Sequence, residues 1–319
     1  MKKVILITGT SSGMEKKPRK QIQKKYNVRA VILLLTLTLS VVSFKTVHAQ
    51  AHDKKVVVVT GSASGIGKAT CQLLVSKGYI VYGGDIQVEK NKYLDSIGGH
   101  SLALDVTNEE QVKASVDRVI KEQGRIDILY NNAGFGIMGT AEETSMEDAH
   151  KLMEVNVFGY VRMVQAVLPY MRAQKSGRII NTTSMGGKIY FPLASWYIAS
   201  KHALEGWLDC LRIEVKEFGI GVVIIEPGFI NTNFYNVSGE YGKKYAPNSA
   251  YGHLFGPISK APLPKMSEPV VIAKIVEKAI TKKHPKTRYV KGKNGKLLIG
   301  MRNTFGDKFY DWMVMSQVK

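Results

Sequence analysis

A tyrosine and a lysine stand four residues apart within Ser195 to Phe218, a run with the pattern of a long helix. Side chains at that spacing share one helix face, so Tyr197 and Lys201 should point the same way. A free phenol has a pKa of about 10, and a nearby ammonium lowers it by stabilising the phenolate. Such a pair could act as general acid and base between an alcohol and a carbonyl. The same spacing also occurs on ordinary helix surfaces.

Ser184 precedes this pair, in the turn Ser184-Met185-Gly186-Gly187 that leaves a predicted strand over residues 177–182. A hydroxyl at that place could hold a substrate oxygen and share the charge that develops on it. We therefore expect Ser184 to face the same site as the tyrosine.

A glycine-rich turn follows the β-branched run Val56 to Val59, which is typical of a strand buried on both faces. Gly61, Gly65 and Gly67 then lead into a predicted helix over residues 68–76. The free N–H groups of a helix N-terminus, with no side chains in the way, suit a pyrophosphate. A tight turn without a ligand is the alternative interpretation.

Asp85 follows the second predicted strand, which covers residues 79–82 and ends at Gly83-Gly84-Asp85. A carboxylate there can accept hydrogen bonds from both adenosine ribose hydroxyls and repels a 2′-phosphate. Ser64, within the glycine turn, is not basic. These features favour NAD as the cofactor and leave NADP open.

Apolar strands and amphipathic helices alternate from residue 54 to the C-terminus, which predicts one doubly wound α/β domain with a mostly parallel sheet, a Rossmann domain. The predicted strands cover residues 56–59, 79–82, 101–104, 125–130, 177–182, 221–225 and 285–290. Ligands of such sheets bind outside the carboxyl ends of the strands. The glycine turn, Asp85, Asn131, Ser184 and Pro227 all follow such ends.

Several motifs together resemble those of the short-chain dehydrogenase/reductase family. They are T-G-x-x-x-G-I-G at 60–67, N-N-A-G at 131–134, Asn156, Ser184, Y-I-A-S-K at 197–201 and P-G-F-I-N-T at 227–232. The resemblance implies metal-free hydride transfer between a nicotinamide and a substrate carbon. It also implies a homodimer or homotetramer, paired through the helices that carry Asn156 and Tyr197.

The resemblance implies four catalytic residues: Asn156 would hold a proton-relay water, Ser184 the substrate oxygen, Tyr197 would exchange the proton, and Lys201 would assist it and bind the nicotinamide ribose. Asp105 and Val106 would lie by the adenine, and Thr232 by the carboxamide. The full cofactor-binding set predicted is Thr60, Gly61, Ser64, Gly65, Ile66, Gly67, Asp85, Asp105, Val106, Asn132, Ala133, Gly134, Tyr197, Lys201, Pro227, Gly228, Ile230 and Thr232.

Residues 233–268 are predicted to form an irregular substrate lid. An aromatic wall of Tyr235, Tyr241, Tyr245, Tyr251 and Phe255 would suit a lipophilic or steroid-like alcohol or ketone. P-K-T-R-Y-V at 285–290 and G-D-K-F-Y-D-W at 306–312 resemble the hydroxysteroid and retinol dehydrogenase-like branch of the family. The alternative interpretation is a surface excursion without a role in binding.

Residues 1–53 form an extension with two features. Val4 to Ile7 with Gly9 and Gly13 repeat the glycine motif incompletely, and residues 30–49 follow a basic region as a signal or a membrane anchor does. If this segment acts as a signal or anchor, the protein is exported or membrane-associated; otherwise it is cytoplasmic.

The formal net charge of +19 is concentrated at the two ends of the chain. Residues 243–319 hold 16 Lys and Arg against 4 Asp and Glu, which could meet an anionic lipid surface. No motif of a nucleic-acid-binding fold is present, so we expect no nucleic acid partner. The two alternatives to an enzyme are a dinucleotide-binding protein without turnover and a membrane-tethered interaction protein.

Overall fold

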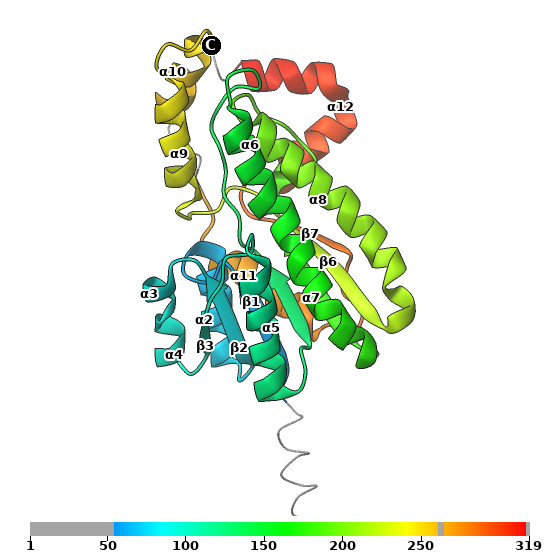
Figure 1. Ribbon diagram of the computed structural model, residues 1–319. Coiled ribbons are helices and arrows are strands. Elements are labelled where there is room, and N and C mark those ends of the chain that lie inside the picture. Colours follow the sequence, from blue (N-terminus) through cyan, green and yellow to red (C-terminus); the bar gives the residue numbers. More distant parts are fainter. Residues whose placement is uncertain (1–53, 261–264, 317–319) are drawn as a thin grey trace, which may run out of the picture. The chain divides into compact units, whose positions relative to one another are not determined.

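The computed structural model describes residues 54–260 and 265–316, which belong to one compact unit beginning at Lys54. The incomplete glycine motif and the predicted signal or anchor segment lie outside the described residues. The unit is built around one sheet of seven strands in the order β3-β2-β1-β4-β5-β6-β7, with every pairing parallel (Figure 1). The predicted α/β Rossmann domain is confirmed.

The strands fall where the sequence predicts them, with bounds shifted by a few residues. They are β1 (Val56–Thr60), β2 (Ile80–Asp85), β3 (His100–Ala103), β4 (Ile128–Asn131), β5 (Gly177–Thr182), β6 (Ile220–Pro227) and β7 (Arg288–Lys291). β2 continues through Gly83 and Gly84. These positions need glycine because a Cβ there would lie within 2.5 Å of the side chains of Leu94 and Leu104. The two glycines therefore mark close packing inside a strand instead of the end of one.

Helices cover both faces of the sheet. They are α2 (Gly65–Ser76), α3 (Val88–Asn91), α4 (Tyr93–Ser96), α5 (Glu109–Gln123), α6 (Met146–Met153), α7 (Gly159–Ala173), α8 (Ser195–Glu214), α9 (Phe234–Tyr245), α10 (Gly252–Lys260), α11 (Val270–Thr281) and α12 (Gly295–Met315), with short π or 3-10 turns η1 (Glu154–Phe158), η2 (Met185–Gly187) and η3 (Lys216–Phe218). Helices α5, α7 and α8 pack on one face, and α2 and α11 pack on the other (Figure 1).

The run of valines in β1 shows why the sheet is buried on both sides. Val56 and Val58 join the core beneath α5, α7 and α8, whereas Val57 and Val59 join the core beneath α2 and α11. Alternate side chains of a strand point to opposite faces, so a strand covered by helices on both faces needs apolar residues throughout. All four valines are at most 1% exposed.

The helix that carries Asn156 is interrupted. Its middle, η1, is a π-helical turn with Asn156 inside it, between α6 and α7. The Asn156 amide nitrogen donates to the carbonyl of Phe135, and its oxygen accepts from the N–H of the same residue. Wide turns of this type are rare and occur often at functional sites.

The prediction that residues 233–268 are irregular is wrong, because this segment contains α9 and α10. Contacts with α6 and with the loop before it hold the two helices. The Lys244 ammonium pairs with Asp148 at 2.6 Å, and the Tyr251 hydroxyl donates to Glu142 at 2.6 Å. These partners are about 100 positions away in the chain. Because distant partners hold these helices, the sequence of the segment itself gives only a weak indication that it is helical.

Within residues 54–260 and 265–316, none of the helices combines the length and the apolar character that crossing a membrane requires.

Gly67→Ala tests whether the glycine turn needs its close contact. A Cβ at Gly67 would lie 1.9 Å from the Gly61 carbonyl oxygen, so we expect the variant to lose about 1–3 kcal/mol of unfolding free energy in urea denaturation. The control is Gly206→Ala in α8, where a Cβ meets no atom within 4 Å and the gain in helix propensity is worth up to about 1 kcal/mol. Equal stability of the two variants would contradict this account.

Candidate active site

A cleft of about 750 Å³ lies at the carboxyl edge of the sheet. Of the predicted site residues it is lined by Gly61, Ser64, Gly65, Ile66, Asp85, Asp105, Val106, Asn132, Ala133, Gly134, Ser184, Tyr197, Lys201, Pro227, Gly228, Ile230 and Thr232. Thr60, Gly67 and Asn156 do not line it. The structure therefore gathers into one cleft most of the residues that sequence patterns single out, and it places these three behind its wall.

The glycine turn is shaped to bring backbone close to a ligand. Gly61 and Gly65 have φ of +71° and +53°, a region that side chains disfavour. Ser64, the residue at the N-cap of α2, makes no side-chain cap, and the first turn of α2 holds no acidic residue. No capping side chain or acidic residue of this first turn competes with an anion for the first N–H groups of the helix. The turn therefore fits the pyrophosphate of a dinucleotide.

Thr60 acts behind the cleft. Its hydroxyl accepts hydrogen bonds from the backbone N–H groups of Asn132 and Ala133 at 3.0 and 3.1 Å. The Asn132 amide in turn donates to the carbonyls of Thr60 and Gly61 at 3.2 Å. These bonds join the turn after β1 to the turn after β4, so the two segments form one rigid floor for the cofactor.

Asp85 lines the cleft and is held in place by two backbone groups. One oxygen of its carboxylate accepts from the N–H of Ala63 at 2.9 Å, and the other accepts from the N–H of Gln87 at 2.8 Å. Ile86, the next residue, is 69% exposed and also lines the cleft. A fixed negative charge beside an apolar side chain offers a 2′-phosphate no cation, and it leaves carboxylate lone pairs free to accept from ribose hydroxyls.

Tyr197 and Lys201 both face the cleft from α8, as their spacing predicts. The Lys201 ammonium donates to the Thr182 carbonyl at 3.2 Å and lies 5.9 Å from the centre of the Tyr197 ring. Burial lowers the pKa of Lys201 to about 8, and Glu205 opposes this shift. At neutral pH the lysine is therefore mainly charged.

Burial raises the pKa of the Tyr197 phenol to about 12, and the Ser184 hydroxyl acts in the opposite direction. The sequence predicts a lowered pKa from the lysine, but burial outweighs that effect because the ammonium is not bonded to the phenol. The phenol thus keeps its proton at neutral pH and can donate it.

Ser184 forms the N-cap of η2, where its hydroxyl oxygen accepts from the N–H of Gly186 at 3.0 Å. This bond fixes the oxygen beside the cleft and leaves the hydroxyl proton to be donated. Ser184 and Tyr197 can therefore both bond one substrate oxygen, which is the arrangement a carbonyl needs as negative charge develops on it.

Asn156 is fully buried beneath the turn after β4. Besides its two bonds with the Phe135 backbone, its amide donates to the Ser200 hydroxyl at 3.2 Å. A Cβ on Gly134 would lie 2.9 Å from the Asn156 oxygen and 3.8 Å from the Lys201 nitrogen. In this structure Asn156 supports the segment between Lys201 and the cleft; its role with a water molecule stays a prediction.

The aromatic wall differs in part from the prediction. Tyr235 and Tyr241 line the cleft, whereas Tyr245, Tyr251 and Phe255 do not. The hydroxyls of Tyr245 and Tyr251 instead bind Asp148 and Glu142, and Phe255 is buried.

Sequence reasoning also missed apolar residues that line the cleft: Phe135, Met138, Phe191, Phe229 and Phe234. The ring of Phe234 lies 5.1 Å from that of Tyr197, and the ring of Phe135 stacks on that of Tyr241 at 6.0 Å. For two of these residues the sequence gives a local indication, because they lie next to predicted site residues: Phe135 directly follows N-N-A-G, and Phe234 directly precedes Tyr235.

The family model described as short chain dehydrogenase matches residues 55–240, more than half of the chain. Among solved structures, a short-chain dehydrogenase from Streptomyces avermitilis is 31% identical with a TM-score of 0.69, and the alignment covers 83% of this chain and 98% of that one. Similar solved structures include complexes with NAD and with NADP. The chain belongs to the short-chain dehydrogenase/reductase family, oxidoreductases that act on alcohol and ketone groups with NAD(P).

Two characterised relatives bear on the substrate. The 3-ketodihydrosphingosine reductase of Bacteroides thetaiotaomicron is 44% identical over 181 residues, which span 56% of this chain and 65% of the relative. The NADPH-dependent 3-dehydrocapnine reductase of Ornithobacterium rhinotracheale is 35% identical over 73% of this chain and 86% of the relative.

Tyr197→Phe tests the proposed proton donor. We expect turnover to fall by about 10²–10⁴-fold, since the variant removes general-acid catalysis, while the dissociation constant of NADH stays unchanged in a fluorescence titration. Tyr79→Phe, at a tyrosine that does not line the cleft, is the control and should keep full turnover. Wild-type protein that binds NADH but reduces no carbonyl would support the alternative of a dinucleotide-binding protein without turnover.

Proposed function

We propose that the protein reduces the ketone of a lipid or another large apolar substrate to a secondary alcohol, with NADH as the preferred donor. The observation that carries this proposal is the phenol of Tyr197, which faces, together with Ser184 and Lys201, a cleft walled by aromatic side chains. Both features favour a hydrophobic carbonyl that receives a proton.

The residues have separate tasks in this reduction. Bound reduced nicotinamide supplies a hydride to the carbonyl carbon. The Ser184 hydroxyl donates a hydrogen bond to the carbonyl oxygen, and Tyr197 gives that oxygen its proton. The Lys201 ammonium, charged at neutral pH, stabilises the phenolate that remains. In the opposite direction Tyr197 must first lose its proton, so we expect oxidation of the alcohol to be faster at alkaline pH than at neutral pH.

The substrate class rests on the wall of the cleft and on the two relatives. Phe135, Phe191, Phe229, Phe234 and Met138 present apolar surface, which suits a long or flat hydrophobic group. Both relatives are named as reductases of 3-keto or 3-dehydro compounds. We therefore favour a lipid ketone and keep steroid-like ketones as the second class, as the sequence suggested.

The cofactor preference rests on Asp85 and Ile86. A 2′-phosphate would lie near the Asp85 carboxylate and would meet no cation at position 86, so NADH should bind better than NADPH. In this respect we expect the protein to differ from the NADPH-dependent relative.

A reduction assay tests substrate and cofactor together. NADH or NADPH oxidation would be followed with 3-ketodihydrosphingosine, a 3-ketosteroid and a small polar ketone. We expect the highest kcat/KM with the lipid ketone, and about a tenfold or greater preference for NADH, which corresponds to about 1.4 kcal/mol. Turnover of the polar ketone alone would overturn the substrate class.

The matched variant for the cofactor is Asp85→Ser combined with Ile86→Arg, which replaces the carboxylate and adds a cation. This variant should reverse the preference toward NADPH, and it should also be less stable because it lacks the carboxylate that accepts from the N–H groups of Ala63 and Gln87. An unchanged ratio would show that these two positions do not select the cofactor.

Subunit pairing through α7 and α8 is part of the proposal. Exposed apolar side chains lie on or beside both helices: Phe158 of η1, directly before α7, is 49% exposed, and Ile213 of α8 is 69% exposed. Pairing of subunits through these helices would cover both side chains. This supports the homodimer or homotetramer that the family resemblance implies.

Contact with an anionic membrane surface is a second candidate function, favoured by α12. The rings of Phe305, Phe309 and Trp312 form a chain with centroid distances of 4.8 and 5.7 Å. Phe305 and Trp312 are 60% and 66% exposed, and Lys308 lies between them in the sequence. Aromatic rings beside lysines are typical of helices that lie in a lipid interface.

Vesicle co-sedimentation tests this surface. We expect binding to phosphatidylglycerol vesicles at low salt, weaker binding at high salt because each lysine contributes about 1 kcal/mol at low ionic strength, and little binding to phosphatidylcholine. Phe305→Ser with Trp312→Ser should abolish binding, whereas the control Met146→Ser, at an exposed methionine of α6, should not. Binding that survives the double variant would rule out α12 as the contact.

A further inference from the structure

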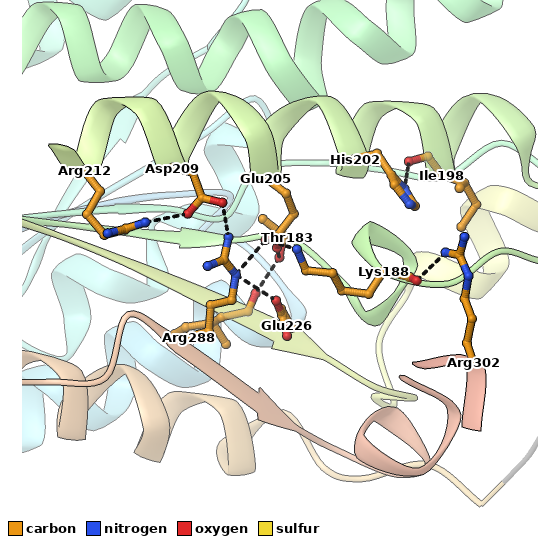
Figure 2. A network of polar contacts seen from close by, with 11 residues as sticks. Thr183, Lys188, Ile198, His202, Glu205, Asp209, Arg212, Glu226, Arg288 and Arg302 are labelled. Carbon is orange, nitrogen blue, oxygen red and sulfur yellow. Dashed lines mark hydrogen bonds and ion pairs between the residues drawn. The ribbon is translucent and has the colours of Figure 1, made fainter. Parts of the chain in front are cut away.

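Two buried carboxyl groups lie close together behind the catalytic residues. Glu205 comes from α8 and Glu226 from the end of β6, and their side chains are 4% and 3% exposed. Figure 2 shows Arg288 of β7 reaching both of them from the opposite side. The Arg288 Nε lies 3.0 Å from Glu205 and 3.4 Å from Glu226, and its Nη2 lies 2.6 Å from Asp209.

Like charges buried at such proximity need a cation. A buried carboxylate without a partner is strongly destabilising, and two of them repel each other. Lys188 pairs with Glu205 at 3.1 Å, but its side chain is 34% exposed. Glu205 is the one carboxylate with which it forms an ion pair among the described residues. The planar fork of Arg288 is the group that contacts three carboxylates together.

The network is bonded directly to the segments that carry the catalytic groups. The Thr183 hydroxyl donates to Glu205 at 2.6 Å. Thr183 stands between Thr182, whose carbonyl accepts from Lys201, and Ser184. Glu205 itself lies one helical turn beyond Lys201 on α8.

The network also adjoins the Pro227 segment of the cleft, and a second arginine from the C-terminal segment lies near it. Glu226 immediately precedes Pro227 and Gly228, which line the cleft. Arg302 of α12 donates to the carbonyl of Lys188, just after η2 (Figure 2). Each segment that presents a catalytic group is therefore joined to the network by a hydrogen bond, an ion pair or the chain itself.

We infer that Arg288 is a positioning residue for the reduction: by holding Glu205 and Glu226 together it fixes the segments that present Ser184, Lys201 and Pro227. This inference rests on the proposed function. Arg288 lies beyond residues 55–240, the part matched by the family model. The C-terminal segment thus supports the catalytic residues as well as the lid.

The charge on Glu226 makes the inference testable by pH. Burial and the neighbouring Glu205 raise the pKa of Glu226 to about 7, and Lys188 and Arg288 oppose this rise. These three are the charged groups that face it, from α8, from the turn after η2 and from β7. Below that pKa Glu226 is neutral and needs no cation; above it, Arg288 stabilises the ionised carboxyl, so removing Arg288 is more damaging at high pH than at low pH.

The central experiment compares Arg288→Met with wild type across pH in the ketone reduction assay. We expect kcat to fall by less than about twofold near pH 6 and by about tenfold near pH 8.5, because in the wild type Arg288 compensates the charge of Glu226 only at the higher pH. The double variant Arg288→Met with Glu226→Gln should regain most of the kcat lost at high pH. Arg288→Lys, which keeps the charge and loses the fork, should lie between wild type and Arg288→Met.

Arg178→Met is the matched control. Arg178 also joins the sheet to the C-terminal segment, by donating from β5 to the carbonyls of Ile280 and Lys282, but it has no carboxylate partner in this network. It should lower the unfolding midpoint without a pH-dependent loss of kcat and without rescue by Glu226→Gln.

Thermal unfolding separates failure of this inference from failure of the proposed function. The gap in midpoint between wild type and Arg288→Met should widen as pH rises and close in the double variant, whatever the substrate is. A loss of kcat that is equal at every pH, or one that Glu226→Gln does not restore, overturns the positioning role. Wild-type protein that reduces none of the ketones, with the midpoints behaving as expected, overturns the proposed function and with it the catalytic role of Arg288, and leaves only the charge network.

Discussion

The parallel pairing of β1, β4, β5 and β6 is the constraint on which the rest of the structure depends. Because these strands run in the same direction, their carboxyl ends meet at one edge. The register aligns Asn131 with Asn181, and Thr182 with Ile225. The glycine turn, the turn after β4, the Ser184 loop and the Pro227 segment therefore open onto one cleft. Antiparallel pairing of any one of these strands would send its functional loop to the far side of the molecule.

Burial sets the chemistry of that cleft. Burial disfavours the charged forms of both Tyr197 and Lys201. The phenol therefore keeps its proton at neutral pH, and the pKa of the lysine falls to about 8. Glu205 opposes the second shift and keeps the ammonium charged. Burial thus keeps the proton on Tyr197, and a carboxylate outside the cleft favours the charged form of Lys201 beside it.

The segment after β6 completes the site in two ways. Helix α9 brings Phe234 and Tyr235 over the cleft, and its contacts with Asp148 hold it there. β7 brings Arg288 beneath the cleft, against Glu205 and Glu226. One contribution shapes the space for a substrate, and the other compensates buried charge. Both come from chain beyond the glycine-rich and N-N-A-G motifs.

Local patterns alone were sufficient for the strands, the glycine turn and the pairing of Tyr197 with Lys201 on one helix face. Each of these follows from short-range physics: alternate burial, the conformational freedom of glycine and the helical repeat. The tertiary structure decided which aromatic residues line the cleft, that Asn156 lies behind it, and that residues 234–260 contain helices. It also joined Arg288 to Glu205 across 83 positions. Contacts of that kind depend on how the elements pack together, and spacing within a single element carries no signal of them.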